Sequence, residues 1–114
     1  MLTIDALQQY GANVQEGLER CMNDEAFYLE MVNLTLTDGN YEKLAEAVLA
    51  GDKKAAFDAA HALKGIIANV ALTPLFTQIS EITELLRARE EADYPAYLAQ
   101  ILREREKLIT LRDS

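Results

Sequence analysis

The sequence predicts an all-α protein: an up-and-down antiparallel four-helix bundle with short extra helices at its N-terminal end. Apolar residues recur at helical spacing in several segments, and capping residues or glycines separate these segments by short connections. Strand-like alternation is nearly absent. Short connections between long helices favour antiparallel neighbours. With 114 residues, 50% of them hydrophobic, the chain is expected to form a single domain over residues 1–114.

Three short helices are expected in the N-terminal part. The first ends at Gly11, and the second starts at Asn13, which has capping-box spacing to Glu16. Asp24 is the expected N-cap of the third, which the TDGN stretch ends. The expected ranges are 4–10, 13–20 and 24–36. In the third helix the residues at helical spacing are Phe27, Met31 and Leu34, with Tyr28 as a further candidate.

Four longer helices are expected to form the bundle. One covers YEKLAEAVLA and stops at Gly51, and the next runs from its N-cap Asp52 to about Ala71. Thr73 followed by Pro74 predicts the start of a helix over 75–89, and Asp93 with Pro95 opens the last helix. The expected inward residues are Leu44, Ala47 and Val48; Leu63 and its neighbours; Leu75, Ile79, Ile82 and Leu86; and Leu98, Ile101, Leu102, Leu108 and Leu111.

Composition argues against several classes of function. A net charge of −8 is unfavourable for binding nucleic acid. One cysteine and one histidine cannot form a disulfide or a His/Cys metal cluster, so no metal site is expected. No phosphate-binding glycine pattern, membrane span or signal peptide is visible, so we expect a cytoplasmic protein that does not bind membranes.

The segment AAHALKGIIANVAL, residues 59–72, holds the only histidine of the chain. On a helical wheel centred on Leu63, His61 lies roughly 160° from the centre, because each residue advances about 100°. His61 is therefore expected to point away from the core. The residues expected to face inward with Leu63 are Ala56, Ala59, Ala60, Ile66, Ile67 and Val70.

The neighbours of His61 on this outer face suggest an approach by another molecule. A glycine inside a helix costs about 1 kcal/mol relative to alanine, yet Gly65 has no packing role on the wheel. It leaves the surface beside the imidazole open. Lys64 is one turn from His61 and can reach an anion held on the ring. Lys53 and Lys54 extend a local basic rim. An exposed imidazole is largely neutral and nucleophilic at neutral pH, which suits phosphoryl acceptance.

The stretch AHALKGIIANVAL resembles the signature of histidine-containing phosphotransfer (HPt) domains. The matching residues are His61, Leu63, Lys64 and Gly65, with Ala68 at a small-residue position. The resemblance implies that His61 receives a phosphoryl group from the aspartate of one receiver domain and passes it to another. It also implies that Lys64 steadies the phosphoryl oxygens and that Gly65 and Ala68 keep the approach clear.

The resemblance carries further expectations about the site and its partners. Arg87, on the next helix, is the candidate for a second phosphoryl-stabilising residue. The Mg²⁺ ion belongs to the receiver, so the chain is expected to be a phosphocarrier with no cofactor and no independent catalysis. The expected partners are a hybrid sensor histidine kinase and response-regulator receiver domains. We expect a monomer, and the start at Met1 without kinase motifs leads us to expect a free-standing protein.

Two features depart from the family pattern. Ala71 replaces a late glycine, and Ile66-Ile67 replace a pair of small residues. Both isoleucines are expected to face inward and to alter packing more than chemistry. These departures leave open an alternative, a helical interaction module that binds a receiver or kinase without accepting phosphate. A third reading, an enzyme with His61 as general base, lacks a visible partner residue.

Overall fold

The structure, a computed structural model, describes residues 1–114 and consists of seven helices without strands. The all-α prediction is therefore confirmed. The helices are α1 (Ile4–Tyr10), α2 (Val14–Arg20), α3 (Glu25–Leu36), α4 (Asn40–Ala50), α5 (Lys53–Asn69), α6 (Thr73–Arg87) and α7 (Tyr94–Asp113).

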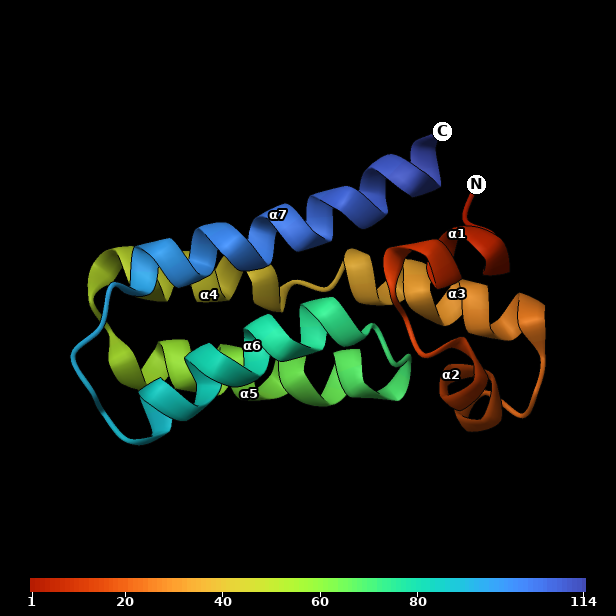
Figure 1. Cartoon of the computed structure of the whole chain (residues 1–114). Helices are drawn as coiled ribbons and strands as arrows, with labels where there is room; N and C mark the ends of the chain where they lie inside the picture. The colour runs from red at the N-terminus through yellow and green to blue at the C-terminus, as the bar shows by residue number, and fades with distance from the viewer.

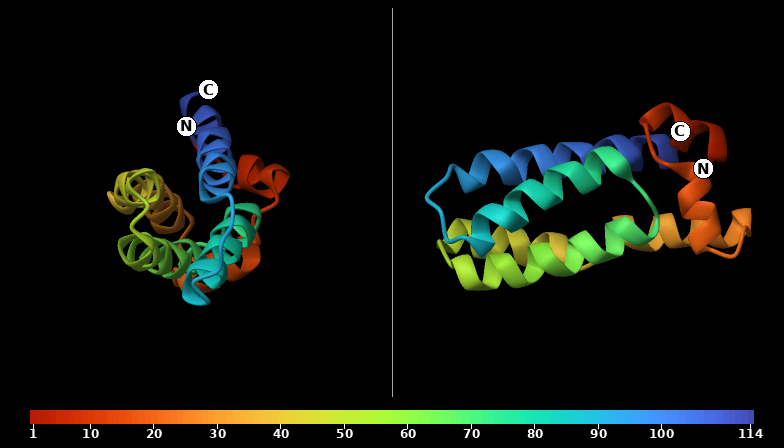
Figure 2. Two further views of the ribbon diagram at one scale, coloured as in Figure 1. Left: turned by 90° about the vertical axis from the view of Figure 1, so that its left-hand side faces the viewer. Right: turned by 60° about the horizontal axis from the view of Figure 1, so that its bottom comes forward.

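Helices α4 to α7 form the predicted antiparallel bundle. Helix α4 packs against α5, α5 against α6, α6 against α7, and α7 against α4. The α4–α5 turn and the α6–α7 loop lie at one end of the bundle (Figure 1). The α5–α6 turn lies at the other end, where the short helices α1 and α2 are found (Figure 2). No helix combines the length and the apolar character that crossing a membrane requires.

Most helix starts follow the predicted caps. The side chains of Asp24, Asp52 and Asp93 each accept a hydrogen bond from the backbone N–H three residues later, at 3.1, 3.0 and 3.2 Å. Such caps satisfy N–H groups that have no partner within the helix. Gly51 ends α4 in the left-handed conformation, with φ 71°. These local signals explain why the number of helices and their order could be predicted.

The predicted boundaries of the α5–α6 turn were wrong by two residues. Helix α5 ends at Asn69, before the expected Ala71, and Ala71 has a left-handed φ of 54°. This conformation turns the chain and places Leu72, which is fully buried, at the N-cap of α6. Thr73 is the first helical residue, and its hydroxyl donates to the Ala71 carbonyl instead of capping. Helix α6 ends at Arg87, two residues before the expected end.

The predicted apolar stripe of α3 was wrong for Phe27, Met31 and Leu34, whereas the further candidate Tyr28 is fully buried. Phe27 and Leu34 are 37% and 55% exposed, and Met31 is only half-buried. The buried residues of α3 are Tyr28, Val32, Thr35 and Leu36. Because α3 carries apolar residues on all sides, spacing alone cannot select its inward face. The face is selected by the partners that Tyr28 finds on other helices.

One continuous core holds 25 buried residues drawn from all seven helices. The predicted stripe of α6 is buried, as are Leu44 and Ala47 of α4 and the α7 side chains Leu98, Ile101 and Leu108. Burying each large aliphatic side chain contributes about 1.5–3 kcal/mol before entropy is counted. Three residues expected in the core are instead partly buried against it: Val48, Leu102 and Leu111.

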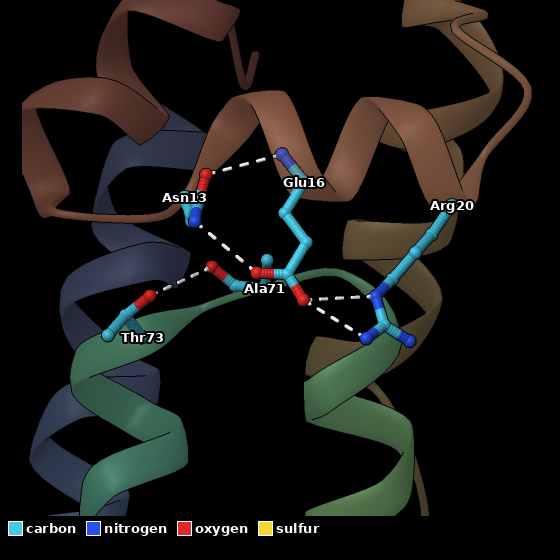
Figure 3. A network of polar contacts seen from close by, with 5 residues as sticks. All are labelled: Asn13, Glu16, Arg20, Ala71 and Thr73. Carbon is cyan, nitrogen blue, oxygen red and sulfur yellow. Dashed lines mark hydrogen bonds and ion pairs between the residues drawn. The ribbon is translucent and has the colours of Figure 1, made fainter.

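The N-terminal helices hold the C-terminal end of α5. The Tyr28 hydroxyl donates to the Val70 carbonyl at 2.9 Å, and the Asn13 backbone N–H donates to the Ala71 carbonyl at 2.9 Å. Figure 3 shows Asn13 near Ala71 at this junction; the Asn13 side chain caps α2 by accepting from the Glu16 N–H. The Glu16 carboxylate contacts Asn13 Nδ2 and pairs with Arg20. Carbonyls at the end of α5 that lack helical partners are thus satisfied.

Candidate functional site

His61 lies on the exposed face of α5, as the helical wheel predicts. Its ring stacks on that of Phe57, one turn earlier, with centroids 5.5 Å apart and an interplanar angle of 18°. No hydrogen bond or ion pair of the structure involves the imidazole, so both ring nitrogens are free to meet a partner. The stack restricts the ring's orientation without blocking its nitrogens.

Lys64, the predicted phosphoryl-stabilising residue, follows His61 by one turn. Its ammonium lies 3.4 Å from Glu84 Oε1, a carboxylate oxygen on α6. The hydrogen bond from Lys64, with a smaller contribution from Arg87, holds the pKa of the Glu84 carboxyl below its usual value. The lysine that sequence reasoning placed beside the histidine is therefore held by a carboxylate of the neighbouring helix.

Arg87 reaches the same cluster from the last turn of α6. Its Nε donates to Glu84 Oε2 at 3.1 Å, and its guanidinium carbon lies 5.1 Å from the centroid of the Phe57 ring. A guanidinium at this distance from an aromatic ring is attracted by a cation–π interaction. Arg87 is thus linked to His61 through Phe57.

The surface beside the imidazole is open at Gly65. A Cβ built on Gly65 would meet nothing within 4 Å, so the glycine serves no packing role within this chain. Ala68 follows on the same side and is partly exposed. Of the two isoleucines expected to face inward, only Ile67 is fully buried. Ile66 is half-buried and lies outside the core cluster, so its predicted position was wrong.

The expected basic rim is partly neutralised. Lys53 pairs with Glu91 at 2.7 Å, and Lys54 lies 4.0 Å from Asp58. Both lysines nevertheless line a surface depression of about 730 Å³ together with Phe57, Asp58, Leu86, Arg87 and Arg89. Four of these seven lining residues are basic, so the depression next to the His61–Phe57 stack has an excess of positive charge in an acidic protein.

Sequence reasoning missed two residues of this site, Phe57 and Glu84. Phe57 stands four residues before His61, which places the two rings on one face of any helix. That spacing was a usable signal. Glu84 stands three residues before Arg87, but its contact with Lys64 depends on how α5 and α6 pack together. No pattern within one helix could have identified it.

The arrangement suits a surface nucleophile with cationic neighbours. Hydrolytic catalysis of the serine–histidine type needs an oriented hydrogen-bonded partner for the histidine, and His61 has none. No group of three or more His, Cys, Asp or Glu side chains comes together as a metal site. A free imidazole nitrogen, an ammonium one turn away and an open approach are the elements that phosphoryl acceptance needs.

Comparison with known protein families identifies the family to which the chain belongs. The family model of the Hpt domain matches residues 34–111, about two thirds of the chain, and this range contains α4 to α6, all of α7 except its last two residues, and the whole site. The chain belongs to the Hpt domain family, and this membership implies a histidine phosphotransfer role in a phosphorelay. Hpt domains are phosphocarriers, and no catalytic family is evident. Neither a curated protein nor a solved structure was found to match the chain.

Proposed function

We propose that His61 is the residue that carries the phosphoryl group, accepting it from the aspartate of one receiver domain and passing it to another. The observation that supports this most directly is the position of the chain's only histidine. It is exposed within the Hpt-matched range, stands one turn before Lys64, and lies beside the open surface at Gly65.

The transfer is a direct displacement at phosphorus. The lone pair of the unprotonated imidazole nitrogen attacks, the N–P bond forms, and the P–O bond to the aspartate breaks to release a carboxylate. The other ring nitrogen keeps its proton throughout. Lys64 and Arg87 offset the negative charge of the phosphoryl oxygens. The Mg²⁺ ion that assists this chemistry is supplied by the receiver domain.

The surface around His61 supports docking of a receiver. Gly65 and Ala68 leave room for a close approach, and the partly exposed Ile66 and Phe57 offer apolar contact area beside the imidazole. Lys53 and Lys54 form the basic rim of this surface. The proposed partners are a hybrid sensor histidine kinase and a response regulator, with the chain acting as a monomer in the cytoplasm.

The departure at Ala71 gives little support to the alternative of a non-phosphorylated binding module. Ala71 already adopts the left-handed φ of 54° that a glycine at this position would adopt. The alanine therefore leaves the path of the backbone intact. It lies at the end of α5, away from the exposed face that carries His61.

A phosphotransfer assay tests the proposal. Purified wild-type chain and the His61→Gln variant are incubated with phosphorylated receiver domains and Mg²⁺, and acid-labile, base-stable phosphate on the chain is measured. Label is expected on the wild type only, with unchanged helical circular dichroism in the variant. Label retained on His61→Gln contradicts the proposal. Binding without label from any donor supports the non-phosphorylated module.

A matched pair of lysines tests the role of Lys64. Lys64→Gln is expected to slow acceptance about tenfold, because an ammonium that stabilises the transferring oxygens is lost. Lys107→Gln, which removes an ion pair between the exposed Lys107 and the partly buried Glu104 on α7, should leave the rate unchanged. Equal rates for both variants and the wild type would assign Lys64 no part in the transfer.

A further inference from the structure

Glu84 is the one acidic residue that contacts both cations proposed to stabilise the phosphoryl group. Its Oε1 lies 3.4 Å from the Lys64 ammonium, and its Oε2 accepts from Arg87 Nε at 3.1 Å. Each carboxylate oxygen is thus occupied by a different cation. An exposed glutamate is charged at neutral pH, and the hydrogen bond from Lys64 lowers the pKa of Glu84 further.

A phosphoryl group on His61 would compete with this carboxylate for Lys64. Lys64 stands one turn from His61 on the same helix, and its contact with Glu84 crosses to the neighbouring helix. The phosphoryl group carries nearly two negative charges, whereas Glu84 carries one. The Lys64 and Glu84 side chains are 29% and 56% exposed, so their pair is weak and can exchange partners easily.

We propose that Glu84, on α6, is a positioning residue. It binds the Lys64 ammonium while His61 is unmodified and releases that ammonium to the phosphoryl group after transfer. This inference rests on the proposed function of His61 and extends it to regulation of the same site. Because breaking the Lys64–Glu84 pair opposes phosphorylation, Glu84 lowers the stability of the phosphorylated form. The group is then more easily passed on to the next receiver.

The first test compares Glu84→Gln with a matched variant on the same helix, Glu81→Gln. Glu81 lies one turn earlier, is exposed, and takes part in none of the ion pairs. At equilibrium with a phosphorylated receiver and Mg²⁺, Glu84→Gln should raise the ratio of phosphorylated to free chain about two- to fivefold, the range of an exposed ion pair. Glu81→Gln should change it much less.

A background that lacks both cations, Lys64→Gln with Arg87→Gln, separates this mechanism from a general loss of negative charge. If Glu84 acts by holding cations away from the phosphoryl group, Glu84→Gln should produce no further increase when both of its partners are already absent. The proposal is overturned if the increase persists in that background, if Glu81→Gln produces the same increase, or if Glu84→Gln lowers the phosphorylated fraction.

A second measurement does not depend on phosphotransfer. Inorganic phosphate is titrated into the unphosphorylated chain at low ionic strength while the ring protons of His61 are followed by NMR. Glu84→Gln should tighten phosphate binding about two- to fivefold, and Glu81→Gln should not. Equal affinities in wild type and Glu84→Gln overturn the inference. If the wild type accepts no phosphoryl group but phosphate binding tightens as expected, the proposed function fails while the competition between Glu84 and a phosphate for Lys64 stands.

Discussion

The Tyr28 hydroxyl donates a 2.9 Å hydrogen bond to the Val70 carbonyl, joining α3 to the C-terminal end of the histidine-bearing helix. Tyr28 is fully buried, and its ring lies directly over Gly17 of α2. The consecutive helices α2 and α3 therefore meet the distant C-terminal end of α5 at one contact. Substitutions at this contact should change the stability of the fold without touching the outer face of α5.

Gly17→Ala should destabilise the chain by about 1–3 kcal/mol, because the new Cβ would lie 2.5 Å from Tyr28 Cε1 and force the ring to move. Urea unfolding measures the effect. Gly39→Ala is the matched control, since a Cβ there meets nothing within 4 Å, and its stability should stay within about 0.5 kcal/mol of wild type. Similar losses in both variants would contradict the close packing of Tyr28 on Gly17.

Stability should fall at alkaline pH. Burial raises the pKa of Tyr28 to about 12, whereas a tyrosine in an unfolded chain titrates near pH 10. Below pH 10 both states keep the proton, so the contribution of Tyr28 is fully present there. Between pH 10 and 12 only the unfolded state loses it, and stability falls by up to about 1.4 kcal/mol per pH unit.

Urea unfolding of wild type and Tyr28→Phe from pH 8 to 11.5 measures this contribution. At pH 8 the variant should be less stable by about 1–2 kcal/mol, because the Val70 carbonyl loses its buried partner. Its decline above pH 10 should be shallower than that of wild type. Burial also raises the pKa of Tyr10 and Tyr41, so a smaller decline should remain. Parallel curves would show that Tyr28 does not titrate in this way.

Gly65→Ala should raise the stability of the fold and slow phosphotransfer. Open space around Gly65 means that a methyl group fits, and replacing a glycine within a helix should stabilise the chain by up to about 1 kcal/mol. Phosphotransfer should slow about tenfold or more, because a displacement of about 1 Å between reacting groups costs on the order of 100-fold in rate. Thermal unfolding and the receiver assay measure the two effects. An unchanged transfer rate would show that receivers do not approach over Gly65.

Ala71→Gly should stabilise the chain by up to about 1 kcal/mol. An alanine with a left-handed φ of 54° is strained by about 1–2 kcal/mol, and glycine relieves that strain. The loss of a buried methyl group offsets part of the gain. Urea unfolding measures the difference. A clearly destabilised variant would mean that packing of the Ala71 methyl group outweighs the backbone strain.

The helices were predictable because their signals are local. A capping aspartate and the N–H group that it satisfies are three residues apart, so Asp52 predicts the start of α5 without knowledge of the fold. The inward face of α3 was not predictable. It depends on the contacts of Tyr28 with Gly17 on the preceding helix and with Val70, which is 42 residues away in the sequence.

The same distinction applies to the candidate site. His61, Lys64 and Gly65 lie on one helix, so helical geometry alone places them on one outer face. The pairing of Lys64 with Glu84 joins two helices and depends on their packing register. Arg87 was expected from the family resemblance, but its link to His61 through Phe57 is a tertiary feature. The phosphorylation of His61 itself stays a prediction.

Because Phe57 stacks on His61, the NMR signals of the His61 ring protons report on the state of the site. His61 is the only histidine of the chain, so its ring protons give one identifiable pair of signals without isotopic labelling. The ring current of Phe57, with centroids 5.5 Å apart, shifts those signals from their positions in a free imidazole. Any ligand, modification or partner that turns the imidazole away from Phe57 will move them. The resting state of the acceptor, its phosphorylated state and its receiver-bound state can therefore be followed in one unmodified sample.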